Sequence, residues 1–220
     1  MTLQKEHSGS QSPLMEAIVA NTLRPHNYEL VRQLGQVLGI KAEDHVLLIA
    51  EGTLEAQRLL EHEIGCTVVA HQGDLHNLPY ATEQFDSAIV AVPVTREVHA
   101  IARELSRVLK STGTLGMVVL SVYRDQMPDD ATLFNAVLPL IASTRPAAAY
   151  RAVLAECGFT AFVSRDRRRD VQRTARAAYS QHLLPSASEP MLDQPVASQA
   201  IELIATGGVG VTIITAEKGL

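Results

Sequence analysis

The chain has 220 residues, of which 24 are acidic and 19 basic, and its net charge is −5 with the histidines neutral. This length suits one compact α/β domain, and the acidic balance argues against nonspecific nucleic-acid binding as the main activity. No apolar run approaches the roughly 18 residues of a spanning helix, and the N-terminus MTLQKEHSGSQSP lacks the basic start and apolar core of a secretion signal, so we expect a cytoplasmic protein without membrane contact.

The first part of the chain changes character at Pro13. Residues 1–12 are polar and rich in Ser, Gly and Gln, which predicts a disordered lead, and residues 13–220 are expected to form a single domain. Apolar residues then recur at helical spacing as far as Leu38, with a break at Arg24-Pro25. Two helices are therefore expected before the first strand.

Strand and helix signals alternate from residue 45 onward. The patterns predict strands at 45–50, 66–70, 85–92, 115–122, 159–168 and 211–218, and helices at 53–64, 97–109, 129–143, 146–156 and 197–205, with a further helical start near 170. A parallel crossover needs a dozen or more residues, which these helices supply. The alternation therefore predicts a mostly parallel sheet with helices on both faces.

Two stretches carry a family resemblance. Gln72 to Val92 reads QGDLHNLPYATEQFDSAIVAV, and Ala102 to Leu120 reads ARELSRVLKSTGTLGMVVL. Together they resemble the middle of a class I S-adenosylmethionine (SAM) dependent methyltransferase, of the group that includes the ubiquinone/menaquinone C-methyltransferases and the arsenite methyltransferases. The resemblance implies a Rossmann-like three-layer sandwich with an antiparallel last strand, SAM as the cofactor and methyl transfer as the reaction.

The spacing before the Gly-Asp pair differs from that family. Members of the family carry a complete extra strand and helix there, whereas residues 51–72 can hold only one helix and one strand. We infer that one βα unit is missing, namely the second strand, whose end supplies the acidic residue for the ribose hydroxyls. We therefore expect about six strands, with the strand at 66–70 directly beside the one at 45–50. This short edge strand should be covered by a loop or the N-terminal segment, or paired across a dimer.

The turn after the first strand reads HVLLIAEGTLEA, where the family has an acidic residue and three glycines. Leu48 stands in place of the acidic residue, and Ala50 and Leu54 replace the outer glycines. A branched side chain at 54 would occupy space that the methionine part of SAM needs. Glu51, Gly52 and Thr53 either keep a vestigial cofactor contact or form an ordinary helix N-cap, which is the interpretation we favour.

Gly73, Asp74 and Leu75 match the family position where a carboxylate meets the adenine amino group and the next residue lines the ring. Asp74 also suits a plain turn after a strand. His71 and His76 flank this segment, but their spacing matches no metal-ligand signature, and surface histidines are common, so we expect no metal.

The remaining polar candidates are weaker. Val92, Pro93 and Val94 offer no general base where the family places substrate-facing residues, and Tyr123, Arg124 and Asp125 are the nearest polar side chains. Six arginines cluster between residues 165 and 176. They form either a patch for nucleic acid or an acidic partner or, as we favour because Asp166 and Asp170 are interleaved and no aromatic lies among them, a solvated face or an interchain ion-pair surface.

Cys66 and Cys157 are too few for a disulfide framework or a zinc cluster, so each is expected to pack as a small apolar residue. The resemblance implies several cysteines for an arsenic substrate, which is therefore disfavoured.

Two hypotheses remain. In the first, the protein has lost SAM binding and acts as a partner subunit, a regulator or a binder of another small molecule. In the second, it is an active methyltransferase whose unorthodox cofactor site is completed by a dimer mate. SAM is the cofactor only in the second case.

Overall fold

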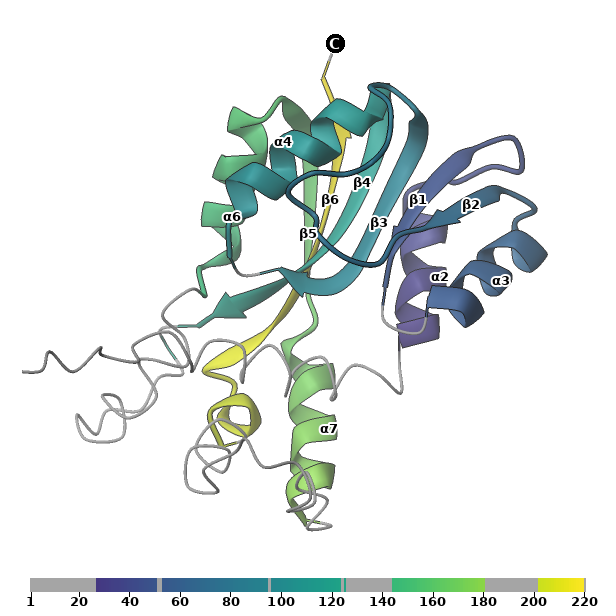
Figure 1. Ribbon diagram of the computed structural model, residues 1–220. Coiled ribbons are helices and arrows are strands. Elements are labelled where there is room, and N and C mark those ends of the chain that lie inside the picture. Colours follow the sequence, from purple (N-terminus) through teal and green to yellow (C-terminus); the bar gives the residue numbers. More distant parts are fainter. Residues whose placement is uncertain are drawn as a thin grey trace, which may run out of the picture.

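The computed structural model describes residues 27–50, 53–94, 96–123, 125, 144–180 and 202–219. The expected lead at 1–12, the first expected helix and the expected helix at 129–143 lie outside these ranges. Within them, a six-stranded sheet has helices on both faces (Figure 1). No helix in the part of the chain that the structure describes is both long and apolar enough to cross a membrane.

The elements follow the expected alternation. The strands are β1 (His45–Ile49), β2 (Thr67–Ala70), β3 (Phe85–Val94), β4 (Leu109–Val122), β5 (Phe159–Asp166) and β6 (Val209–Lys218). The helices are α2 (Asn27–Val37), α3 (Thr53–Glu63), α4 (Val98–Val108), α6 (Ala147–Glu156) and α7 (Arg168–Ser180), and residues 202–206 are also helical.

The strand order is β2-β1-β3-β4-β6-β5. The pairs β1–β2, β1–β3 and β3–β4 are parallel, whereas β6 runs antiparallel to both β4 and β5. The expected fold class is therefore confirmed: a Rossmann-like, mostly parallel sheet between helix layers, with an antiparallel last strand.

Strand β2 lies directly beside β1. Val46 pairs with Val68 and Leu47 with Val69, and no other strand of the described residues lies between them. Only α3 connects the two strands in sequence. The expected six strands and the expected pairing at this edge are both confirmed.

The outer edge of β2 is partly covered by a side chain of α3. The N–H of Thr67 donates to Asp44 O at 3.0 Å, and the N–H of His71 donates to Leu48 O at 2.8 Å. The backbone N–H and C=O groups of the odd-numbered residues of β2 therefore point toward β1. The carbonyl of Val68 points the other way and accepts a bond from Gln57 Nε2 at 3.2 Å. A helix side chain thus protects this edge, a cover that the sequence analysis did not anticipate. Pairing of the edge across a dimer stays a prediction.

The core consists of two layers, one on each face of the sheet. Val46 and Leu48 of β1 belong to the layer under α2, α3 and α7, and Leu47 and Ile49 to the layer under α4 and α6. All four side chains are buried, as expected for a parallel strand covered on both faces. Helix α2 approaches β4 so closely that a Cβ at Gly116 would lie 2.9 Å from Leu34 Cδ2, which explains the glycine there.

Candidate functional site

The carboxyl ends of the parallel strands β1, β2, β3 and β4 meet at one edge of the sheet. In open α/β sheets this edge is where ligands bind. The segments that follow these strands, including the start of α3, the loop at 71–80 and the start of α4, contain nearly all of the candidate site residues.

At the end of β1 the structure places apolar side chains. Leu48 is fully buried in the core, Ala50 is 6% exposed, and Leu54, in the first turn of α3, is 54% exposed. An apolar side chain therefore stands open to solvent at the N-terminus of this helix. Glu51 and Gly52 lie outside the described residues, and the side chain of Thr53 is not described, so the N-cap interpretation stays a prediction.

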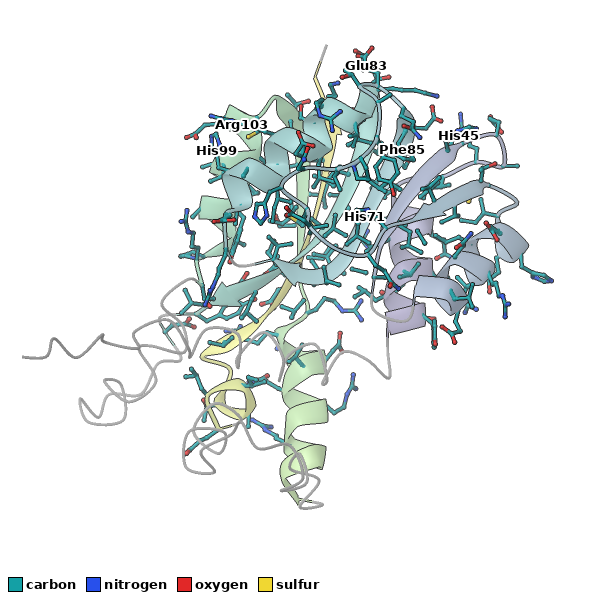
Figure 2. The ribbon with its side chains drawn as sticks, viewed as in Figure 1. His45, His71, Glu83, Phe85, His99 and Arg103 are labelled. Atoms are coloured by element: carbon teal, nitrogen blue, oxygen red, sulfur yellow. The ribbon has the colours of Figure 1, made fainter. Side chains whose placement is uncertain are left out.

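The loop after β2 is held from within by His71. The imidazole Nδ1 lies 3.3 Å from Tyr80 Oη, and Nε2 lies 3.1 Å from the carbonyl oxygen of Asp74. Tyr80 packs edge-on against both His71 and Phe85. His71 is only 9% exposed, so its interpretation as a surface histidine is wrong: its ring nitrogens anchor the loop from inside the fold (Figure 2).

Helix α4 clamps the same loop from outside. Arg107 donates from Nη1 to Tyr80 O at 2.7 Å and from Nη2 to Leu78 O at 2.9 Å. The carboxylate of Glu104 accepts the Leu78 N–H at 2.9 Å and pairs with Arg107 at 2.7 Å, and this bond to Arg107 lowers the pKa of Glu104. The sequence analysis missed both residues, although their i,i+3 spacing in ARELSRVLK was a signal.

The three residues matched to the adenine position follow one another in this loop, and two of them are exposed to solvent. Gly73 has φ 127°, Asp74 is exposed, and Leu75 is partly buried against the core layer under α4. The Asp74 carboxylate accepts the His76 N–H at 2.8 Å and lies 2.5 Å from His76 Nδ1. The pKa of Asp74 is lowered, first by the backbone bond from His76 and then by its side chain.

His76 also contacts the start of α4, because its Nε2 pairs with the carboxylate of Glu97. Glu97 precedes α4 in the left-handed region, with φ 49°. The sequence analysis did not single out this residue. The contact joins the loop after β2 to the segment after β3.

The end of β4 holds a satisfied polar cluster. Tyr123 donates its hydroxyl to Asp166 at 2.9 Å and lies 3.2 Å from Thr212 Oγ1, and the Arg168 guanidinium lies 4.2 Å above its ring. Burial raises the pKa of Tyr123 to about 12. Of its expected companions, Asp125 is exposed and Arg124 lies outside the described residues. Val92 is partly buried and Val94 fully buried at the end of β3, and the side chain of Pro93 is not described.

The arginine cluster forms bonds within the chain. Arg167 and Arg173 both pair with Asp170, at 2.6 and 2.8 Å, and Arg168 pairs with Asp166 at 3.6 Å. Arg176 donates to Ala205 O at 3.1 Å. Because these ion pairs lie within the chain, they favour the solvated face, and the interchain ion-pair surface stays a prediction.

The described residues bring no group of three or more His, Cys, Asp or Glu side chains into an arrangement for a metal. Cys66 is buried and Cys157 partly buried, and burial raises the pKa of both thiols.

SAM needs acidic acceptors at the ends of the first two strands as well as the adenine-binding carboxylate. Asp74 is the residue that the sequence resemblance matches to the last of these, while the described residues at the two strand ends are Leu48 to Ala50 and Val69 to His71, none of them acidic. These residues fit the adenine end of SAM better than its ribose and methionine parts.

Comparisons with known proteins agree with the fold. Residues 25–117 match the model of a methyltransferase domain family, and a search of curated proteins found no significant match. Geranyl diphosphate methyltransferase in complex with SAM superposes with a TM-score of 0.67 at 12% identity, covering 92% of this chain and 90% of that one. Haemonchus contortus phosphoethanolamine N-methyltransferase 2 gives 0.65 at 11% identity, covering 87% and 53%.

The [4+2]-cyclase SpnF gives a TM-score of 0.63 at 16% identity, covering 88% of this chain and 81% of that one. These likenesses establish the fold, and the family model extends the agreement to the sequence of the first strands and the turns between them. The chain therefore resembles the class I SAM-dependent methyltransferases, in sequence over residues 25–117 and in fold over most of its length.

Proposed function

We propose that this methyltransferase-fold protein has lost or weakened SAM binding and acts as a non-catalytic partner, a regulator or a binder of another small molecule. The observation that carries the proposal is the direct pairing of β1 with β2. The family strand whose end holds the ribose carboxylate has no counterpart between them, and β2 ends at Ala70, which is followed by His71. The ribose hydroxyls of SAM would lose their acceptor.

The turn after β1 supports the same conclusion independently. Leu48 is buried in the core at the place of an acidic residue, and Leu54 projects at the helix N-terminus, where the cofactor needs close approach to backbone N–H groups. The missing strand, the missing carboxylate and the substituted glycines all reduce affinity for one ligand, which favours a common origin over three independent changes.

The second candidate, an active methyltransferase with an unorthodox cofactor site, is favoured by the loop after β2. His71, Glu104 and Arg107 hold this loop in place, and the carboxylate of Asp74 stays exposed. A dimer mate would then complete the site. The structural neighbours include proteins named as methyltransferases and one named as a cyclase, so the fold is compatible with either candidate.

Calorimetric titration of SAM and S-adenosylhomocysteine into the purified protein separates the two candidates. We expect dissociation constants no tighter than about 1 mM, which corresponds to about −4 kcal/mol. Leu54→Gly alone should not restore binding, because the ribose acceptor is still missing. A low micromolar constant that Asp74→Ala weakens at least tenfold would contradict the proposal and favour the active enzyme.

A further inference from the structure

The contact between His76 and two carboxylates connects segments that are far apart in sequence. Asp74 lies on the loop after β2, and Glu97 precedes α4. The side chains of all three residues are well exposed, with 40% of His76, 65% of Asp74 and 67% of Glu97 accessible. The bridge therefore spans the surface at the carboxyl edge of the sheet instead of filling the core.

The bridge requires a charged imidazole. His76 Nδ1 faces Asp74 and Nε2 faces Glu97, and an ionised carboxylate only accepts hydrogen bonds. A neutral imidazole has one N–H and can donate to one of the two, whereas the imidazolium ion donates to both. Loss of the second proton therefore breaks one half of the bridge.

The backbone at Glu97 supports a specific role for this contact. Glu97 adopts φ 49°, and its side chain makes no capping bond to α4. A left-handed conformation is unfavourable for a residue other than glycine and is sustained only by its surroundings. The side chain of Glu97 does not cap the N-terminus of α4 and instead pairs with His76.

The bridge lies between two distinct points of the loop. The first turn of the loop contains Gly73, with φ 127° and open space around the position of a Cβ. Beyond the bridge, Glu104 and Arg107 hold the backbone of Leu78. Residues 74–77 thus form a short strap between Gly73 and the α4 clamp, and the buried His71 ring also contacts its backbone, at the carbonyl oxygen of Asp74.

We propose that Asp74, His76 and Glu97 form a proton-dependent latch that closes this strap onto the start of α4. The latch is shut while His76 carries both ring protons and opens when it loses one. The groups that face His76 are Asp74 from its own loop and Glu97 from the start of α4, and His71 adds a further electrostatic influence on Asp74. Opening releases one of the two carboxylates from His76. The inference concerns the loop alone and holds whether or not SAM binds.

Hydrogen–deuterium exchange tests the latch at about pH 5.5 and about pH 8.5, on either side of the range in which histidine changes its charge. After correction for intrinsic exchange, we expect the amides of His76, Ala100 and Ile101, which donate to Asp74 and Glu97, to lose at least about threefold protection at the higher pH. His76→Gln and Glu97→Gln should remove this difference, because neither variant can form the charged bridge.

His99→Gln is the matched control. His99 pairs with Glu156 at 3.6 Å on the outer side of α4, with the same exposed fractions of 40% and 67% as the pair of His76 and Glu97 (Figure 2). This variant should keep the pH difference at the His76 amide. Equal protection at both pH values in the unmodified protein, or a pH difference that persists in a folded His76→Gln variant, would overturn the proposal.

Discussion

Tyr123 is surrounded by side chains that bind its hydroxyl group and cover its ring. The sequence offered it as a polar candidate near a ligand site, but its hydroxyl is bonded to Asp166 and Thr212, and its ring lies under Arg168. A phenol held in this way connects β4 to β5 and β6. We interpret it as a structural residue.

The raised pKa of Tyr123 makes this interpretation testable by pH. Burial raises the pKa to about 12, from an ordinary value of about 10, so the folded state holds the phenolic proton more tightly than the unfolded chain. The resulting stabilisation is complete below the ordinary value and is lost as the pH rises through the folded one.

We therefore predict that the free energy of unfolding falls between about pH 10 and about pH 12, and that this fall is smaller in Tyr123→Phe. Below about pH 9 the variant should be less stable by about 1 kcal/mol, the usual net value of a lost hydrogen bond. Urea denaturation across the alkaline range measures both effects. An unchanged alkaline fall in the variant would assign the effect to other groups.

Among the elements, α4 does more than cover the sheet. Its Glu104 and Arg107 hold the backbone of the loop that carries Asp74 and Leu75. The guanidinium of Arg107 binds two backbone carbonyls at once, those of Leu78 and Tyr80. Only the forked guanidinium of arginine presents several N–H donors in the fixed geometry that these two contacts require.

We predict that Arg107→Lys destabilises the protein by about 1–2 kcal/mol, since an ammonium cannot serve both carbonyls and the Glu104 carboxylate together. The matched control is Arg103→Lys, an exposed arginine one turn earlier on the same helix, which should change stability by less than about 0.5 kcal/mol. Urea denaturation provides the comparison. Equal effects of the two substitutions would refute the clamp.

The boundaries of the elements show what local pattern can predict. The first three strands were placed within two residues of their observed bounds, because apolar runs flanked by turns mark buried strands well. The start of β4 was missed. Leu109 pairs with Phe85 immediately after α4 ends, and the strand register then shifts before Thr114 pairs with Ser87, with Thr112 at φ 66° between them. The polar residues KSTG give no strand signal.

The site was predictable only in part, for the same reason. Asp74 and Leu54 could be located because they lie next to predicted strands. The roles of Glu97, Glu104 and Arg107 depend on contacts with residues 21 to 29 positions away, and His71 becomes buried only when Tyr80 folds back over it. Spacing along the chain carries no direct signal of such contacts.

The sheet has the fold of the methyltransferases that the chain resembles, but its edge beside β1 is rearranged. Both neighbours of β1 run parallel to it, and one of them, β2, leads into the loop that carries Asp74. We propose that this arrangement leaves the protein without a working SAM site.

Titration of isotope-labelled protein with SAM, followed by the NMR shifts of backbone amides, tests this claim most directly, because it reports both affinity and location. We predict no saturation below about 1 mM, and at most weak, unsaturated shifts confined to residues 73–75. Saturation at micromolar SAM, with shifts at both 52–54 and 73–75, would show a complete cofactor site and contradict the account.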